Sequence, residues 1–319
     1  MRSFHIRLLL FVAIVFIAIV LLDRFLDAGM KKLRYDDASV WNDIYSGKAG
    51  ADILVCGSSR AATHIDASAI EQASGCSCYN LGMMGHNFIL EEARYRIYRQ
   101  HNQKPRLIIF SLDYESLQMR ADLFNHTQFI AYLKDPILSE ATKHYSGFSD
   151  YDYKLPLLRY VGEQELIIRL IKDRLHLEHN VPDRRKGFYG RDMHWDRNVD
   201  QVLDTLQPYV VRPDSISLHR FRSFIESCHA DNIPLIFVHT PVHPVGQQKV
   251  KNREAMIALY RRFSNEYGIP FLDYASDTMC SNKQYFMNST HLNALGASVF
   301  THKLIADLEA RHLLLHCRP

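Results

Sequence analysis

The stretch ILVCGSSRAATHID, residues 53–66, determines how the rest of the chain is interpreted. Its first four residues are apolar and rich in β-branched side chains, which predicts a short buried strand. The strand ends abruptly in Gly57, Ser58 and Ser59. These two serines are either turn residues, or one of them is a nucleophile. The segments that the rest of the chain brings to this point distinguish the two interpretations.

The bulk composition is that of a globular protein and excludes few functions. The chain has 319 residues, of which 47% are hydrophobic and 23% are charged, enough apolar material for one large domain or two small ones. The net charge of +3 gives no reason to expect a nucleic-acid partner. The six cysteines contain no CxxC pair, so they predict no metal site and leave the redox compartment undecided.

Residues 1–29 are expected to form a separate N-terminal segment that inserts into a membrane. An uninterrupted apolar stretch runs from Leu8 to Leu22, and a helix of this length spans about 22 Å before its apolar flanks are added. The stretch is apolar on all faces, unlike a core helix of a soluble domain. No small-x-small cleavage motif follows it, which favours an uncleaved signal anchor over a cleaved signal peptide. Residues 30–48 are polar with scattered aromatics and are expected to form a tether.

The charges around this segment do not favour export. Two basic residues precede the apolar stretch and four follow it, at positions 24, 31, 32 and 34. The positive-inside rule alone would therefore keep the following domain in the cytoplasm.

Beyond the tether, five β-rich stretches alternate with helical patterns. The strands are expected at residues 53–56, 76–82, 106–113, 233–242 and 269–276, and the helices at 64–75, 88–102, 217–232, 249–268 and 292–315. This alternation predicts a three-layer α/β/α domain over residues 49–319 with a mainly parallel five-stranded sheet. Residues 115–215 interrupt it and are expected to be an insertion over the sheet that shapes substrate choice.

Three polar segments follow strands of this sheet. Ser58 and Ser59 follow the first strand, residues 79–87 (YNLGMMGHN) end the second, and residues 287–293 (MNSTHLN) follow the fifth. Reactive groups collect beyond the carboxyl ends of parallel strands, so these segments are expected to meet.

A serine, a histidine and two backbone amides in these segments would suffice for acyl transfer. A serine hydroxyl needs a base within hydrogen-bonding distance and donors for the oxyanion. His291 is the candidate base, and the amides of Ser59 and Gly85 are the candidate donors, with a glycine allowing close approach of the backbone. The competing interpretation is structural, with turn serines and glycines and a helix-capping or core His291.

Two further histidines, His239 and His243, lie in the segment VHTPVHP. Prolines 241 and 244 exclude the helix on which an i, i+4 histidine pair would bind a metal. We expect no metal here; a lining role near the active site is the alternative to a structural one.

Taken in order, the motifs GSSR, NxGxxG and STHLN before a terminal helix resemble those of the SGNH (GDSL-like) hydrolase superfamily. The most similar branches are membrane-anchored bacterial ones, similar to D-alanyl-transfer protein and to alginate O-acetyltransferase subunits. The resemblance covers residues 51–114 and 216–310. It implies a flavodoxin-like fold and a serine hydrolase mechanism without a cofactor.

The resemblance also implies roles for individual residues. Ser59 matches the family nucleophile, and Ser58 stands where an aspartate is usual. Asn80 and Gly85 match the second motif, the latter as an oxyanion donor. The asparagine of the third motif has no match, since FSLDYES, including Asp113, stands there.

The fourth motif, DxxH, is altered. His291 matches its histidine, but Asn288 replaces its aspartate. An amide oxygen can accept from the imidazole N–H but carries no full charge. Either Asn288 serves weakly, or another carboxylate replaces it; Asp273 is the first candidate, followed by Asp113 and Asp277.

The resemblance therefore predicts a serine-dependent acyl-ester hydrolase or O-acyltransferase acting on a carbohydrate or cell-envelope polymer. Candidate substrate contacts are Arg60, Asn80 and Asp113, and a membrane-bound O-acyltransferase is a candidate partner. Family members of this type work outside the cytoplasm, which favours a periplasmic domain against the charge count. The alternative is a non-catalytic binding or assembly protein of the envelope, favoured by Asn288 and by the missing third motif.

Overall fold

The computed structural model describes residues 2–34, 36–177, 184–196 and 207–317. The chain forms two compact units. One comprises residues 1–42 and 121–182, and the other comprises residues 43–120 and 183–319. The expected insertion, residues 115–215, is thus divided between the units, and parts of it lie outside the described residues.

The larger unit contains a five-stranded sheet with the order β2-β1-β3-β4-β5. The strands are β1 (Ile53–Gly57), β2 (Cys78–Asn80), β3 (Leu107–Ser111), β4 (Leu235–His239) and β5 (Phe271–Asp273). All four pairings are parallel, with Val55 of β1 opposite Asn80 and Ile109. This is the flavodoxin-like strand order, and the predicted fold class is confirmed.

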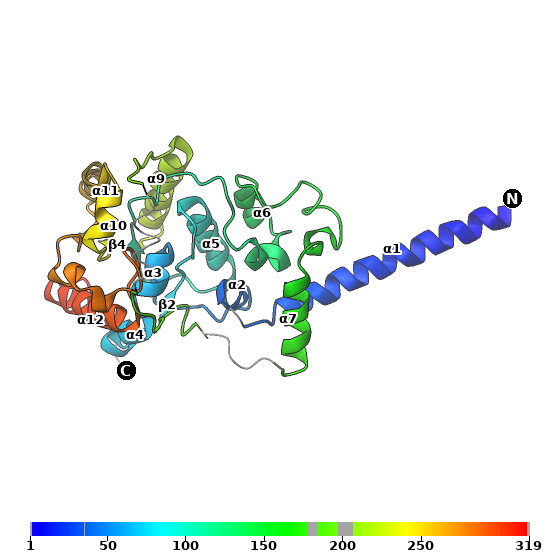
Figure 1. Ribbon diagram of the computed structural model, residues 1–319, viewed down its shortest axis with the longest axis horizontal. Helices are drawn as coiled ribbons and strands as arrows, with labels where there is room; N and C mark the ends of the chain where they lie inside the picture. Colours follow the sequence, from blue (N-terminus) through cyan, green and yellow to red (C-terminus); the bar gives the residue numbers. More distant parts are fainter. Residues whose placement is uncertain (1, 35, 178–183, 197–206, 318–319) are drawn as a thin grey trace. The chain divides into compact units, whose positions relative to one another are not determined.

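Helices cover both faces of this sheet (Figure 1). They are α3 (Ser59–His64), α4 (Ala67–Ser74), α5 (Phe88–His101), α9 (Ser215–Ala230), α10 (Pro244–Lys249), α11 (Arg253–Tyr267) and α12 (Ala294–Ala310). One face of β1 and β3, including Val55 and Ile109, packs with α3, α4 and α12 in a single core. On the other face, Phe110 of β3 contacts Phe88 of α5 and Phe221 of α9. Successive strand residues point to opposite faces, so each strand serves both cores.

Local capping signals define several helix boundaries. Asp66 accepts a hydrogen bond from the Ser68 amide at the start of α4. Gly75 and Gly268 end α4 and α11 with φ of 68° and 63°, a conformation that favours glycine. The helix expected over 249–268 begins only at Arg253, because Lys249 is the last residue of the separate short helix α10.

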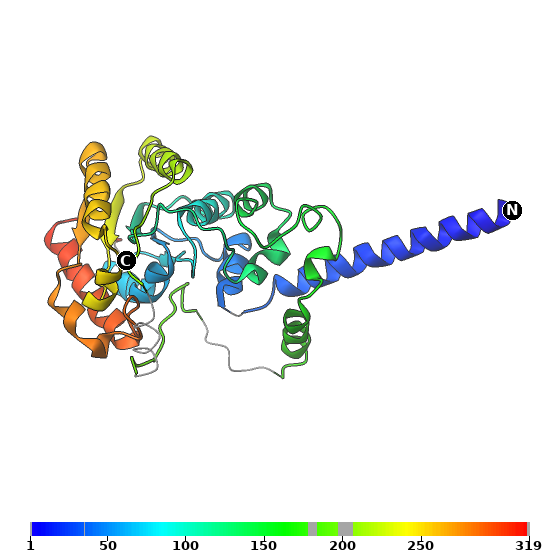
Figure 2. The ribbon, with the colours of Figure 1, turned by 45° about the horizontal axis from the view of Figure 1, so that its top comes forward.

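The smaller unit contains the N-terminal helix α1 (Arg2–Met30). It also contains η1 (His126–Tyr132), α6 (Pro136–Thr142), η2 (Leu158–Tyr160) and α7 (Gln164–Arg174), while α2 (Asp36–Tyr45) runs from this unit into the other. The N-terminal part of α1 is a single, fully exposed helix (Figure 2). Residues Ser3–Met30 are long and apolar enough to cross a membrane, as expected of a signal anchor or a signal peptide.

The segment expected to be a tether contains ordered structure. Residues 36–45 form α2, in which Val40 and Trp41 are fully buried. The indole N–H of Trp41 donates to Gln128 at 3.1 Å. Val40, Trp41 and Ile44 thus form a buried face of α2, and this part of the segment is a packed helix and not a loose linker.

A disulfide joins Cys76 and Cys317 across 241 residues of sequence. Sequence spacing did not reveal this pair, because the two cysteines meet only once α4 and the chain terminus are placed. The remaining cysteines of the described chain, Cys56, Cys78, Cys228 and Cys280, are buried thiols.

Loss of the disulfide is expected to destabilise the larger unit, because the bond restricts a very long loop in the unfolded chain. We predict that Cys317→Ser lowers the free energy of unfolding by about 2–5 kcal/mol. Urea titrations with and without reductant measure it. Reductant should shift the wild-type midpoint and leave that of Cys317→Ser in place; an unmoved wild-type midpoint contradicts the prediction.

Candidate active site

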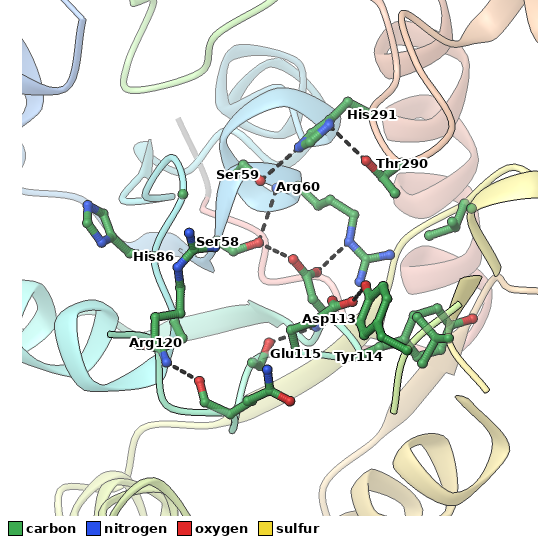
Figure 3. A pocket seen from close by; sticks show the side chains of 18 residues that line it. Ser58, Ser59, Arg60, His86, Asp113, Tyr114, Glu115, Arg120, Thr290 and His291 are labelled. Atoms are coloured by element: carbon green, nitrogen blue, oxygen red, sulfur yellow. Dashed lines mark hydrogen bonds and ion pairs between the residues drawn. The ribbon is translucent and has the colours of Figure 1, made fainter. Parts of the chain in front are cut away.

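Ser59 and His291 face each other at the carboxyl edge of the sheet (Figure 3). Ser59 begins α3, separated by one residue from the end of β1, and His291 lies in the loop before α12. The Ser59 Oγ is 2.8 Å from the His291 Nε2. The fold thus brings the two residues from 232 positions apart into hydrogen-bonding distance.

Asn288 fixes the tautomer of His291. The Asn288 Oδ1 accepts hydrogen bonds from the backbone N–H groups of Thr290 and His291 at 3.0 and 2.9 Å, which identifies it as the oxygen of the amide. The same oxygen is 3.1 Å from the His291 Nδ1. This oxygen can only accept, and the Thr290 hydroxyl donates to it at 3.1 Å, which leaves the Thr290 oxygen, 3.0 Å from Nδ1, as an acceptor. Nδ1 therefore carries the proton, and Nε2 presents its lone pair to Ser59.

His291 is held in its neutral form. Its pKa is lowered from the ordinary 6.5 to about 4, first by burial of the ring and then by the positive charges of Arg60 and Arg191. Both effects disfavour the imidazolium. A neutral imidazole that accepts from a serine hydroxyl has the state required of a general base.

The candidate oxyanion donors lie at the same site. The Ser59 amide is in the first turn of α3, and Gly85 lines the cavity around Ser59 with φ of 70°. Within the described residues, neither amide N–H has a hydrogen-bond partner. Two unused donors next to a paired serine and histidine match the requirement for binding a developing oxyanion.

Ser58 is engaged elsewhere. Its hydroxyl donates to the carboxylate of Asp113, and its oxygen accepts from the Arg60 amide at 3.3 Å, capping α3. The Asp113 carboxylate also pairs with the Arg60 Nε at 2.7 Å. Asp113, which follows β3, therefore holds both neighbours of Ser59. This is the place of the missing third motif, and here it carries a carboxylate that fixes the serine turn.

Asn80 and Asp273 lie at the correct edge of the sheet but do not line the cavity around Ser59. The Asn80 side chain is fully buried and bonds to the carbonyls of Ala61 and Ile65 at 2.7 and 2.8 Å. Asp273 pairs with Arg261 at 2.9 Å. Asp277, the later candidate, caps a short 3₁₀ helix by accepting from the Met279 amide.

Among the described residues, the polar contacts of the His291 ring are with Ser59, Thr290 and Asn288. No carboxylate of the described chain takes the place of the triad acid. Asn288, together with the Thr290 hydroxyl, therefore orients His291.

His239 and His243 lie outside the cavity lining. His239 ends β4, is fully buried, and its Nδ1 is 2.7 Å from the carbonyl oxygen of Leu112. His243 caps α10 through its Nδ1, which accepts from the Val245 amide. The structure thus places both histidines in structural contacts.

The cavity over Ser59 has a volume of about 290 Å³ and a wall of mixed polar and apolar character. The wall includes Tyr114, beside Asp113 in the place of the third motif, and five residues that the motifs did not identify: His86, Glu115, Gln118, Arg120 and Tyr209. His86 directly follows Gly85 of the second motif, so its position beside the motif was a usable signal. Tyr209 is contributed from the far end of the expected insertion, and no local pattern marks it.

His64, at the last turn of α3, links the nucleophile helix to the histidine loop. It is fully buried, and burial lowers its pKa well below the ordinary value, so the ring is neutral. Its Nε2 accepts from the Leu292 amide at 3.0 Å, and its Nδ1 donates to the Thr240 hydroxyl at 2.9 Å. Because α3 carries Ser59 at one end and His64 at the other, it fixes both sides of the Ser59–His291 pair.

Replacing His64 is expected to displace His291. We predict that His64→Phe, which removes the acceptor for the Leu292 amide, lowers kcat on an ester by about ten- to a hundredfold with little change in KM. His64→Gln retains an acceptor and should recover part of the loss. Steady-state kinetics beside unfolding midpoints measure it. A fully active His64→Phe variant contradicts this role.

Comparisons with known proteins show likeness in structure only. No family model matches the chain, and no curated protein matches it. A "putative acylhydrolase" from Bacteroides fragilis NCTC 9343 is similar with a TM-score of 0.37 and 13% identity, covering 82% of this chain and 87% of that one. A "putative platelet activating factor" from Streptococcus pneumonia is similar with a TM-score of 0.42 and 12% identity, covering 92% and 98%.

Proposed function

We propose that the protein is a serine-dependent acyl-ester hydrolase or O-acyltransferase. The single observation that carries the proposal is the 2.8 Å contact between the Ser59 Oγ and the Nε2 of a neutral His291 whose Nδ1 faces Asn288. A serine that served only as a turn residue would have no need of a half-buried, tautomer-fixed histidine.

In the proposed reaction, the Ser59 Oγ attacks the acyl carbonyl carbon while its proton passes to the His291 Nε2. The carbonyl oxygen becomes an oxyanion held by the amides of Ser59 and Gly85. Collapse breaks the ester bond, and the leaving alcohol takes the proton from His291. Water or a sugar hydroxyl then attacks the acyl-serine and gives its proton to His291. The bond to the Ser59 Oγ breaks, the Oγ takes this proton back, and the acid or the new ester is released.

Asn288 makes this a weakened version of the Ser–His–Asp arrangement. Its amide supplies the orientation but not the negative charge that stabilises the imidazolium. In serine proteases, asparagine in place of the triad aspartate lowers turnover by about 10⁴. We therefore expect a slow enzyme on simple esters.

The substrate that we propose is an O-acylated carbohydrate or cell-envelope polymer outside the cytoplasm. Polar side chains in the cavity wall, among them Gln118, Arg120 and Tyr209, suit hydroxyl-rich or charged groups. The Cys76–Cys317 disulfide supports an oxidising compartment, since such bonds persist outside the cytoplasm. A membrane-bound O-acyltransferase remains the proposed source of acyl groups if the enzyme transfers them.

The pH dependence follows from the His291 pKa. Protonated His291 cannot accept the Ser59 proton, so activity falls as the pH drops through its pKa. With that pKa lowered to about 4, kcat/KM should stay level down to a pH of about 5 and decline below it. A kcat/KM profile on an acetyl ester measures the acidic limb. A limb at the ordinary histidine value of 6.5 contradicts a neutral base with a lowered pKa.

The test of the proposal uses the full chain in detergent with p-nitrophenyl acetate and a panel of O-acetylated sugars. Turnover that requires Ser59 and His291 supports the hydrolase. His316, near the chain terminus and outside the cavity lining, offers a matched control in His316→Asn. Absence of turnover together with absence of Ser59 labelling by a fluorophosphonate overturns the proposal in favour of a binding or assembly protein.

A further inference from the structure

The C-terminal part of α1 is bonded into its own unit. Asp23 is 2% exposed and pairs with Arg159 at 2.8 Å and with Lys134 at 2.9 Å. It also accepts a hydrogen bond from the Leu157 amide at 2.8 Å. One turn later, Asp27 pairs with Arg159 at 2.6 Å. Both carboxylates of α1 are therefore held by residues 134–160.

These contacts show at which height along α1 the residues that hold it lie. Asp23 directly follows Leu22, the last residue of the uninterrupted apolar stretch. With a rise of about 1.5 Å per residue, the Leu157 amide lies at the end of the apolar stretch, and Asp27 lies about 6 Å beyond it. Carboxylates are costly inside hydrocarbon, so the boundary of a bilayer around α1 falls next to Asp23.

Apolar and aromatic side chains flank Leu157 on the outside of the unit. Tyr151, Leu155 and Val161 are 65%, 48% and 73% exposed. In both ribbon views, the segment between α6 and α7 lies alongside the C-terminal part of α1 (Figures 1 and 2). Single exposed apolar residues are ordinary on a protein surface. These three are distinguished by their place in the segment that bonds to α1 where its apolar stretch ends.

We propose that residues 151–161 form a lipid-contact loop that rests on the bilayer surface around α1. The partner is the headgroup and upper acyl-chain region of a membrane, where tyrosine and aliphatic side chains are favoured. Lys154, in the same loop, can keep its charge in water while its stem lies along the lipid. The unit is then fixed to the membrane at two points, the spanning helix and the loop. This inference rests on the membrane location of α1 and is independent of the catalytic proposal.

The test places a bimane label on the full chain in nanodiscs that contain acyl-chain-brominated phosphatidylcholine. Val161→Cys and Leu155→Cys report on the loop. Ile171→Cys, on α7, is the matched control: it is 52% exposed, and its neighbour Leu170 packs at Gly29, about 9 Å beyond Asp23 along α1. Phe16→Cys, inside the apolar stretch, is the control for membrane insertion. The four free native cysteines are buried, and labelled wild type gives the background.

Bromine should quench the labels at 161 and 155 at least about twofold more than the label at 171, since an interfacial segment buries its apolar face by about 5–10 Å. Strong quenching at 16 with equal quenching at 161 and 171 overturns the lipid-contact loop. Absence of quenching at 16 shows that α1 is outside the bilayer and overturns the proposal as well. Neither outcome bears on ester turnover, which is measured separately.

Discussion

Ser59→Ala is expected to lower acetyl-ester turnover by about 10³-fold or more, whereas Ser58→Ala retains most of it. The Ser59 hydroxyl is 2.8 Å from the His291 Nε2, and its removal deletes the oxygen that attacks the ester and accepts the acyl group. Ser58 instead bonds to Asp113 and caps α3. Its loss costs about 1 kcal/mol of stability and leaves the Ser59–His291 contact in place. Steady-state rates on p-nitrophenyl acetate measure both variants.

The adjacent serines serve as each other's control, since both substitutions remove one hydroxyl at the same turn. Circular dichroism should show both variants folded. An equal loss of turnover in the two variants, or no loss in either, is incompatible with Ser59 as the nucleophile.

Asn288→Asp is expected to raise turnover by about one to three orders of magnitude, since the reverse change in serine proteases costs about 10⁴. The Asn288 oxygen already sits 3.1 Å from the His291 Nδ1 and also accepts from two backbone amides, so a carboxylate fits the same donors. Its negative charge favours the imidazolium and should raise the His291 pKa from about 4. The kcat at the plateau should therefore increase, and the acidic limb of kcat/KM should shift to a higher pH.

Asp273→Ala is the companion variant. Asp273 pairs with Arg261 and does not line the Ser59 cavity, so its loss should leave turnover within about twofold. A neutral or harmful Asn288→Asp together with an inactive Asp273→Ala would show that a carboxylate already serves His291. The proposed role of Asn288 would then be wrong.

The fold was predictable because its signals are local. Apolar runs such as 106–113 and caps such as Asp66 and Gly75 specify strands and helix ends from neighbouring residues alone. The six-residue helix α3 was not predicted, since it is too short to show a helical period. The Cys76–Cys317 bond was not predicted for the opposite reason, because its partners are neighbours only in the folded chain.

For the candidate site, topology predicted proximity but not side-chain direction. The ends of parallel strands share an edge, which places Ser59, Gly85 and His291 together from their order alone. The same rule places Asn80 and Asp273 at that edge, yet the Asn80 amide turns inward to two carbonyls and Asp273 turns to Arg261. Which way a side chain points depends on partners from distant segments, and one sequence does not identify them. His64, with partners at positions 240 and 292, is hidden for the same reason.

The central claim is that Ser59 is a nucleophile activated by His291, and covalent labelling tests it most directly. The full chain is treated with a fluorophosphonate and analysed by intact mass and peptide mapping. The account predicts one adduct, on Ser59, that persists in Ser58→Ala, disappears in Ser59→Ala and forms at least about tenfold more slowly in His291→Asn. An adduct on another residue, an adduct on Ser59 that forms equally fast without His291, or no adduct at all would contradict it.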